Sequence, residues 1–240
     1  LPIFISREDC IFCGLDWFEE TYRQLDPDIL IDWCVDDGEQ VIADQILCTI
    51  SGSSQKIVTG ERTALNFLQV LSATATLSAQ YANAVVNTTT KVLDTRKTLP
   101  GLRMAQKYAV SCGGCENHRL GLFDAFLIKE NHINACDGIE NAVNEARFYN
   151  PDLKVEVEVE NMQELEIAIT ANTDRVLLDN FDIKSLKQAV KLCNEKVITE
   201  ASGNITIDNI NEVAKTGVDF ISVGTLTKDI KAIDLSMRFD

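Results

Sequence analysis

The chain has 240 residues, 45% of them hydrophobic, and a formal net charge of −15, so it is long enough for one large domain or two small ones with a sizeable core. No apolar run approaches the roughly 20 residues that span a bilayer, and the acidic balance argues against a nucleic-acid track, so we expect neither a membrane nor a nucleic acid as partner. The eight cysteines are scattered, mostly inside apolar stretches, which favours reduced thiols in a cytoplasmic protein.

The first part of the chain contains short alternating segments, at residues 29–35, 41–43 and 46–50. This pattern predicts a small, mostly antiparallel β region. From Glu61 to about Val86 apolar residues recur at helical spacing, which predicts one long helix that joins two parts of the protein. We place the first domain at residues 1–90.

After residue 90, short β-like runs alternate with amphipathic helices, which implies a parallel sheet. The runs fall at residues 91–94, 125–129, 155–158, 175–179, 196–200 and 220–224. The helices are expected near residues 102–111, 138–149, 161–171, 183–194 and 207–216. Six such units without a glycine-rich dinucleotide turn favour a closed or nearly closed barrel over a Rossmann sheet. We place this barrel at residues 91–225, and we expect the tail at 226–240 to return to the first domain.

Residues 91–132 form a basic island in this acidic chain. They contain seven Lys and Arg against four acids, a balance of +3, so the rest of the chain carries −18. Such a cluster favours a pocket for a small, multiply charged anion. Arg96 and Lys97 directly follow the first barrel strand, and an arginine fork matches a carboxylate whereas a lysine supplies a point charge for phosphate. His118 and Arg119 follow two glycines, which favours a ligand-binding role over a structural one.

In βα barrels the active site lies at the C-terminal ends of the strands. Five of the six runs end in a charged residue, and we expect these side chains to form a ligand-binding rim: Asp94, Lys129, Glu158, Asp179 and Glu200. Glu158 and Asp179 could hold Mg²⁺ bound to a diphosphate, or they could only neutralise nearby lysines. The segments Ser202-Gly203 and Ser222-Val-Gly224 follow the last two strands, where barrels often build a phosphate cradle.

Two CxxC pairs occur, Cys10/Cys13 and Cys112/Cys115. About a hundred residues separate the two pairs, and their flanks lack the compact knuckle pattern of zinc sites. We therefore expect buried or incidental cysteines here and no shared zinc ion.

Eight short segments carry a resemblance to a known family. They are Glu61–Phe67 (ERTALNF), Asp94–Arg103 (DTRKTLPGLR), Asn117–Arg119 (NHR), Leu127–Ile133 (LIKENHI), Val155–Glu158 (VEVE), Leu178–Asn180 (LDN), Ser202–Asn204 (SGN) and Ser222–Gly224 (SVG). In this order they resemble nicotinate-nucleotide pyrophosphorylase, also called quinolinate phosphoribosyltransferase, from about residue 5 to the C-terminus.

The resemblance implies phosphoribosyl transfer from phosphoribosyl pyrophosphate to quinolinate with decarboxylation, which gives nicotinate mononucleotide, pyrophosphate and CO₂ in NAD biosynthesis. It implies Mg²⁺ as cofactor and an α/β fold with a small N-terminal open α/β sandwich domain and an incomplete parallel α/β barrel. It also implies a homodimer whose active sites are completed by the partner chain. Family members usually begin some tens of residues earlier, so we expect the first domain to be truncated.

The resemblance also assigns roles to single residues. The groups expected to hold the two quinolinate carboxylates are Arg96, His118, Arg119 and Lys129, with Arg62 reaching into the neighbouring subunit's site from the start of the long helix. Those expected to face the ribose, the diphosphate and the metal are Lys97, Glu158 and Asp179, and with Lys129 they form the expected catalytic set. The 5-phosphate cradle would comprise Ser202, Gly203 and Gly224. Cys115 departs from the family pattern, because a glycine run usually continues at this position.

Two alternatives stay open at this point. Lys129 at a strand end would also suit a barrel lyase that forms a Schiff base, provided that burial or a nearby cation favours its free amine. A non-catalytic sensor of a phosphate ligand is the second alternative. The presence of both Glu158 and Asp179 favours catalysis, because a sensor needs no pair of carboxylates to hold a metal ion.

Overall fold

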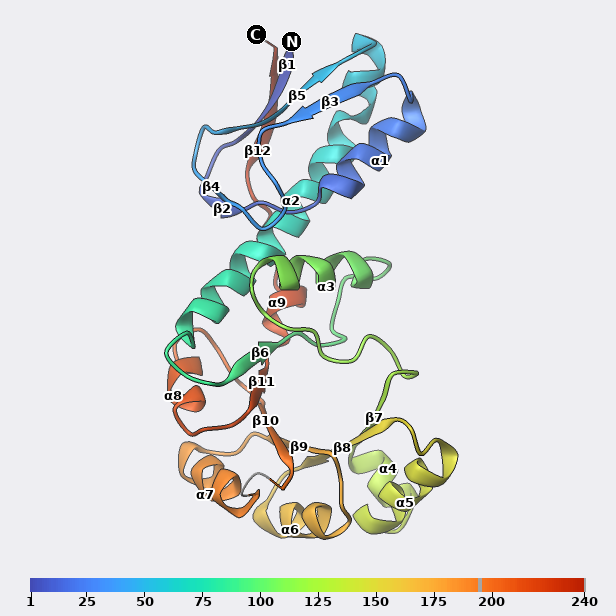
Figure 1. The fold of residues 1–240 in the computed structure, drawn as a ribbon, viewed down its shortest axis with the longest axis vertical. Coiled ribbons are helices and arrows are strands. Elements are labelled where there is room, and N and C mark those ends of the chain that lie inside the picture. Colours follow the sequence, from blue (N-terminus) through green and yellow to red (C-terminus); the bar gives the residue numbers. More distant parts are fainter. Residues whose placement is uncertain (194–195, 240) are drawn as a thin grey trace. The chain divides into compact units, whose positions relative to one another are not determined.

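The protein is described by a computed structural model that covers residues 1–193 and 196–239, and its chain divides into two compact units (Figure 1). Unit 1 comprises Leu1–Gln80, Lys97–Cys115 and Thr225–Asp240. Unit 2 comprises Tyr81–Arg96 and Glu116–Gly224. Residues 97–115, which lie inside the range predicted for the barrel, therefore pack with the first unit. None of the described helices combines the length and the apolar composition that crossing a membrane requires.

Unit 1 contains a four-stranded antiparallel sheet in the order β12-β1-β5-β3. Its strands are β1 (Pro2–Ser6), β3 (Leu30–Trp33), β5 (Ile46–Ser51) and β12 (Leu235–Phe239). The C-terminal strand β12 pairs with β1 over its whole length, from Pro2 opposite Phe239 to Ser6 opposite Leu235. A separate antiparallel pair is formed by β2 (Cys10–Ile11) and β4 (Gln40–Val41).

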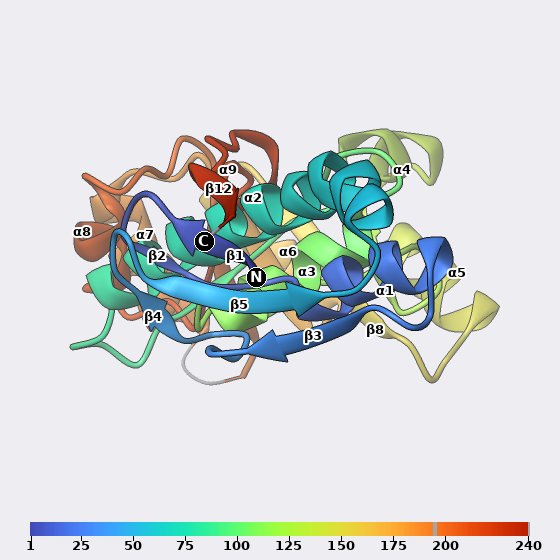
Figure 2. The same ribbon diagram turned by 90° about the horizontal axis from the view of Figure 1, so that it is seen from above.

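Helices α1 (Leu15–Leu25) and α2 (Ser54–Ala84) lie on one face of this sheet (Figures 1 and 2). Phe18 of α1 is fully buried, and its ring centroid lies 4.8 Å from that of Phe4 and 5.0 Å from that of Trp33. The two helices approach closely, since a Cβ at Gly60 of α2 would stand 2.6 Å from the Tyr22 ring of α1. This aromatic cluster therefore forms the centre of the core of unit 1.

Helix α2 begins seven residues earlier than the predicted helix and ends at Ala84. Arg62 consequently lies inside the helix, so the expectation that it lies at the start of the long helix is wrong. Helix α1 was not expected, although Leu15, Phe18, Tyr22 and Leu25 follow helical spacing. Unit 1 is completed by α3 (Arg103–Cys112) and α9 (Thr225–Lys228), which are joined by a 2.9 Å hydrogen bond from the Gln106 side chain to the Thr227 carbonyl.

Unit 2 is built on a six-stranded parallel sheet in the order β6-β11-β10-β9-β8-β7. The strands are β6 (Lys91–Leu93), β7 (Ala125–Ile128), β8 (Lys154–Val159), β9 (Arg175–Asp179), β10 (Ile198–Ser202) and β11 (Phe220–Ser222). The connecting helices are α4 (Glu130–Ala135), α5 (Ile139–Tyr149), α6 (Met162–Thr170), α7 (Ile183–Cys193) and α8 (Ile210–Ala214). The sheet ends at β6 and β7, so the barrel is incomplete. The predicted fold class is confirmed.

The two faces of this sheet differ in polarity. Helices α5 and α6 pack against β8 (Figure 1), and Val155, Val157 and Val159 of this strand are fully buried, so we infer that these valines face the helices. Successive side chains of a strand point to opposite faces, so Glu156 and Glu158 point away from the helices. We call their side the inner face. The pairing of the strands places Arg175 beside Glu156, and Leu177 between Glu158 and Glu200, on the same face. The sheet thus carries charged side chains inside and apolar ones outside.

Candidate active site on the inner face of unit 2

The segment that carries His118 is attached to the edge of the parallel sheet. Glu116 forms a parallel bridge with Leu93 of β6. Asp94, which is fully buried, accepts hydrogen bonds of 2.8 Å from the His118 backbone N–H and from the Asn117 side chain. Asp94 was expected in the ligand-binding rim, but here its carboxylate fixes the backbone before His118 and so orients the imidazole ring.

The His118 ring lies between two buried carboxylates. Its Nε2 stands 3.2 Å from Oε2 of Glu156 and 3.3 Å from Oε1 of Glu200. On the other side of Glu200, the Arg175 guanidinium donates to Oε2 at 2.9 Å and lies 4.4 Å above the Phe220 ring. Oε1 of Glu156 has no hydrogen-bond partner among the described residues. These four side chains form what we call the inner cluster.

Protonation of the inner cluster follows from its charges. Burial disfavours the charged form of His118, but its contacts with Glu156 and Glu200 outweigh burial and raise the pKa of His118 to about 9. Burial also raises the pKa of Glu156. Nδ1 of His118 accepts the Arg119 backbone N–H at 2.7 Å and therefore carries a lone pair. The ring proton is therefore on Nε2, which faces Glu156 and Glu200.

Glu200 responds differently, although it is the more deeply buried carboxylate. Burial alone would raise its pKa, but the hydrogen bond to His118, the charge of Arg175 and a hydrogen bond from Ser222 together lower the pKa of Glu200. It is therefore the carboxylate that stays ionised. The Ser222 hydroxyl, which was expected to face substrate, is engaged with this carboxylate.

Arg119 and Arg96 place two guanidinium groups near each other. Arg119 is half-buried and donates from one guanidinium nitrogen to the Ala125 carbonyl at 3.0 Å. Burial lowers the pKa of Arg119, and the positive charge of Arg96 lowers it further. Two cations that repel each other create a strongly positive potential, and a bound anion with two carboxylates would relieve the repulsion.

The carboxyl ends of β9 and β10 are joined by a polar network. Asp179 accepts hydrogen bonds from the Ser202 hydroxyl at 2.5 Å and from the Asn180 side chain at 2.7 Å. Gly203 has φ +91° and lies so close to Asn180 that a Cβ would stand 2.2 Å from its Oδ1. Only glycine therefore fits at this position, where the chain turns away from β10.

Lys129 follows β7 and forms an ion pair with Glu158 of β8. Glu158 is only 17% exposed, whereas Lys129 is 47% exposed. His132, the second histidine of the basic island, accepts the Lys129 backbone N–H at 3.0 Å and caps helix α4. Lys129 is thus presented from a helix N-cap at the edge of the inner face.

Unit 2 contains most of the side chains predicted for the site: Arg96, His118, Arg119, Lys129, Glu158, Asp179, Ser202, Gly203, Ser222 and Gly224. Lys97 and Arg62 belong to unit 1, and both are exposed.

Sequence reasoning missed that Glu156, Glu200 and Arg175 form one cluster with His118. Glu200 was expected at a strand end, but β10 extends from Ile198 to Ser202, so Glu200 lies in the middle of the strand. The alternation of valine and glutamate in β8 was the sequence signal that could have placed Glu156 on the same face as Glu158.

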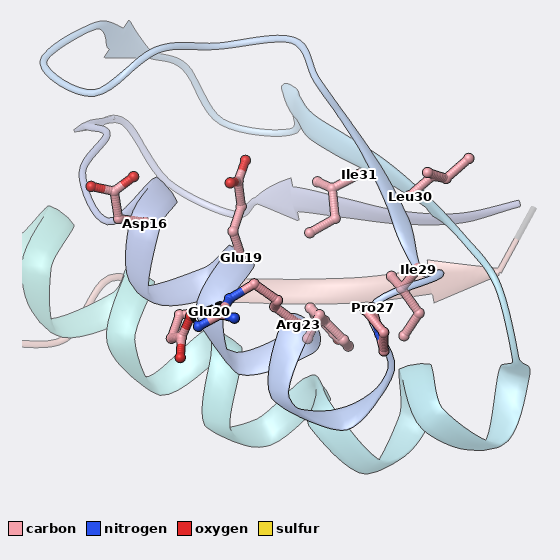
Figure 3. A pocket seen from close by; sticks show the side chains of 9 residues that line it. Asp16, Glu19, Glu20, Arg23, Pro27, Ile29, Leu30 and Ile31 are labelled. Atoms are coloured by element: carbon pink, nitrogen blue, oxygen red, sulfur yellow. Dashed lines mark hydrogen bonds and ion pairs between the residues drawn. The ribbon is translucent and has the colours of Figure 1, made fainter.

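A hollow in unit 1 does not share this chemistry (Figure 3). It lies between α1 and β3 and is lined mainly by Asp16, Glu19, Glu20, Arg23, Pro27 and the residues 29–31. Most of its charged groups already have partners in the chain, because Arg23 donates to Glu20 at 2.6 Å and Glu19 accepts the Trp33 indole N–H at 2.8 Å. We therefore place the candidate site on the inner face of unit 2.

Comparison with family models and curated proteins gives a consistent result. Residues 3–72 match the model of the quinolinate phosphoribosyl transferase N-terminal domain, and residues 74–238 match that of the C-terminal domain. The chain is 40% identical to a chloroplastic nicotinate-nucleotide pyrophosphorylase (carboxylating) from Arabidopsis thaliana, over 99% of this chain and 73% of that protein. It is 39% identical to a probable nicotinate-nucleotide pyrophosphorylase from a Synechocystis strain, over 98% of this chain and 81% of that protein.

A solved structure is similar over nearly the whole chain. The nicotinate-nucleotide pyrophosphorylase from Francisella tularensis matches with a TM-score of 0.97 and 50% sequence identity, over 99% of this chain and 85% of that one. The resemblance inferred from the eight motifs is therefore confirmed.

The inner cluster predicts a specific dependence of stability on pH. The folded-state pKa of His118, about 9, lies above the ordinary value of about 6.5, so its contribution is complete below about pH 6.5 and is lost as the pH rises to about 9. At about 1.4 kcal/mol per pKa unit, the loss is at most about 3.5 kcal/mol. We expect His118→Asn to remove this loss, measured by urea unfolding followed by far-UV circular dichroism.

His132→Asn is the matched control, because it removes the other histidine and leaves the inner cluster intact. The wild-type decline of the unfolding free energy with pH should persist in this control. Equal declines in wild type and His118→Asn would show that His118 is not the titrating group.

Proposed function

The chain belongs to the quinolinate phosphoribosyltransferase family, and we propose that it transfers the phosphoribosyl group of phosphoribosyl pyrophosphate to quinolinate with loss of CO₂. The product would be nicotinate mononucleotide, the compound through which the pyridine ring enters NAD biosynthesis. The observation that carries the proposal is the inner face of unit 2. It combines the cations Arg96 and Arg119 with carboxylates at the neighbouring strand ends, Glu158 and Asp179.

We assign the two ring carboxylates of quinolinate to Arg96, Arg119, His118 and Lys129. A guanidinium offers parallel N–H donors that match a carboxylate in two-point contact, and two adjacent guanidinium groups suit a dianion. The raised pKa of His118 supports its role, because protonation of the ring adds a positive charge to the inner face.

We assign the ribose and diphosphate to Lys97, Glu158 and Asp179, and the 5-phosphate to the turns at Ser202, Gly203 and Gly224. The donor set fits Mg²⁺, since Glu158 and Asp179 offer hard carboxylate oxygens at the ends of adjacent strands and Mg²⁺ takes one or two protein carboxylates beside substrate phosphates. When bound, Mg²⁺ would neutralise charge on the diphosphate. Within the chain, Lys129 forms an ion pair with Glu158, and the Ser202 hydroxyl donates a hydrogen bond to Asp179.

The chemistry needs charge stabilisation more than a protein nucleophile. The quinolinate nitrogen forms a bond to the anomeric carbon as the bond from that carbon to the pyrophosphate oxygen breaks. Positive charge develops on the ribose, where Glu158 or Asp179 would stabilise it, and negative charge leaves with pyrophosphate, where Lys97 would act. The C–CO₂ bond then breaks and its electrons enter the pyridinium ring, after which a proton replaces CO₂ on the ring carbon.

A Schiff-base lyase is less well supported. Such an enzyme needs its lysine as the free amine, whereas a carboxylate partner stabilises the ammonium form. Lys129 has that partner in Glu158. The ion pair therefore favours Lys129 as a fixed cation for an anionic substrate. None of the eight cysteines, which all lie among the described residues, forms a disulfide, and this supports a reducing compartment such as the cytoplasm.

The proposal predicts pyrophosphate release that requires quinolinate, phosphoribosyl pyrophosphate and Mg²⁺, and that EDTA abolishes. Asp179→Asn should lower turnover by on the order of a hundredfold, because it removes a charge that acts on the transition state, and should leave quinolinate binding intact. Asp182→Asn is the matched control, since Asp182 is exposed and only caps α7 through Ser185. Normal turnover of Asp179→Asn across an Mg²⁺ titration would reduce Asp179 to a structural partner of Ser202.

The quinolinate subsite predicts a selective loss of affinity. We expect Arg96→Ala or Arg119→Ala to weaken quinolinate binding at least tenfold, because a charge-assisted contact contributes roughly 1.5–3 kcal/mol. Phosphoribosyl pyrophosphate binding should change much less in the same calorimetric titrations. Arg147→Ala is the control, since Arg147 pairs with Asp174 beside the N-terminal end of β8. Equal losses for both ligands would contradict the assignment.

We also propose that Arg62 completes the site of a partner subunit in a homodimer. Arg62 is exposed on α2, and no carboxylate among the described residues pairs with it, which leaves the guanidinium available for an external anion. In a dimer with two-fold symmetry the same contact is made twice, so each chain would supply Arg62 to the other.

Mixing two inactive variants tests this sharing. When Arg62→Ala and Lys129→Ala chains exchange subunits, one site of each mixed dimer collects both changes and the other has neither. Activity should return to about a quarter of the wild-type value for random exchange of equal amounts. Differently tagged chains establish that exchange has taken place. Exchange without any recovered activity would exclude the shared site.

A further inference from the structure

The two CxxC pairs do not act as pairs, but the fold brings one cysteine of each together in unit 1. Cys13, Cys112 and Asp37 each offer a donor atom, and these three atoms all lie within 4.8 Å of one another. Cys10 instead contacts the Ser6 hydroxyl at 3.8 Å, and the Cys115 thiol contacts the Ser78 carbonyl at 3.2 Å. The expectation of incidental cysteines therefore does not account for Cys13 and Cys112.

The donor atoms are held by the surrounding structure. Cys13 is fully buried, and its backbone exchanges hydrogen bonds of 3.0 and 3.2 Å with the Ser72 side chain of α2. Asp37 accepts the backbone N–H groups of Gly14 and Leu15, at 2.7 and 3.2 Å, at the start of α1. Cys112 is the last residue of α3. Three segments that are distant in the sequence thus converge on one point.

A fourth donor lies at the same point. The Tyr108 hydroxyl, one turn before Cys112 on α3, donates to Asp37 Oδ2 at 2.9 Å and is also hydrogen-bonded to Cys112. The Trp17 ring stands 5.6 Å from the Tyr108 ring and limits its movement. Asp37, Cys112 and Tyr108 are partly exposed, so a small cation has access from solvent while Cys13 closes the site from within.

The charges around this point are negative. The negative charge of Asp37 disfavours negative charge on the Cys13 and Cys112 thiols. The negative charge of Asp16 in turn disfavours negative charge on Asp37. The donor atoms of a buried thiol, a second thiol and a carboxylate face one another here, and one bound cation would stabilise all three in their charged forms.

We propose that Cys13, Cys112 and Asp37 bind a thiophilic divalent cation such as Zn²⁺, with Tyr108 or water as fourth ligand. Donor atoms of a tetrahedral zinc site stand roughly 3.3–3.8 Å apart, given bond lengths of about 2.0–2.3 Å, so the three atoms need to move inward by about 1 Å or less. Binding forms two metal–sulfur bonds and releases the two thiol protons to solvent. The hydrogen bonds of Gly14, Leu15 and Tyr108 to Asp37 would orient its carboxylate. A disulfide would use the sulfurs alone and leave the converging carboxylate and phenol without a role.

Cobalt titration of the reduced, metal-free full chain tests the site. Co²⁺ bound by thiolates gives a sulfur-to-metal charge-transfer band in the near ultraviolet, whereas Co²⁺ on the carboxylates of unit 2 gives none. We expect this band to saturate near one Co²⁺ per chain, to be displaced by Zn²⁺ and to accompany a rise in the thermal unfolding temperature. Cys112→Ser, at a partly exposed position, should abolish the band, and Asp37→Asn should weaken Co²⁺ binding at least about tenfold.

Cys10→Ser and Cys115→Ser are the matched controls, because each removes the other cysteine of a CxxC pair, and both should keep the band. The proposal is overturned if reduced wild type gives no band, if Cys112→Ser keeps it, or if either control loses it. It is also overturned if the two sulfurs form a disulfide in air but bind no metal when reduced. None of these outcomes depends on the proposed enzymatic activity.

Discussion

Two buried carboxylates on the inner face of unit 2 must be paired with positively charged side chains, and this requirement constrains the rest of the site. Glu156 and Glu200 are almost completely buried in neighbouring parts of a parallel sheet, and isolated charges there would be strongly destabilising. His118 and Arg175 supply the positive charge that makes this burial tolerable. Because His118 must reach both carboxylates, the segment that carries it is fixed against β6 by Asp94.

This constraint links the interior of the sheet to the ligand-binding groups at its edge. Arg119 follows His118 directly, and its backbone N–H binds the imidazole ring. Any movement of His118 would therefore move Arg119, one of the two guanidinium groups assigned to quinolinate. Lys129 and Asp179 are engaged with Glu158 and Ser202 in the same way. The site thus consists of cations and carboxylates that neutralise one another, and substrates would replace these internal partners with their own charges.

Part of the architecture could be read from periodicity alone. The parallel sheet was predictable because the segments of β8 and β9 are short runs rich in apolar residues, and each is followed by a segment with helical spacing of apolar residues, α6 and α7. Helix α1 was missed because its apolar positions lie in a short segment between β-like runs, and its burial against Phe4 and Trp33 is what stabilises it. The start of α2 was missed because residues 54–60 are mostly polar and only Ile57 and Gly60 are buried.

The sequence by itself determined which residue types stand at the strand ends and which family motifs they form, because alternation along a strand and spacing along a helix are local properties. It could not determine that Glu156 and Glu200 meet at His118, since that contact depends on the register of three strands and on how the segment after β6 is attached. Nor could it reveal that Cys13 meets Cys112 and not its neighbour Cys10, because that choice depends on how α3 packs within unit 1. Contacts between residues far apart in the chain are decided by packing, and only the tertiary structure contains that information.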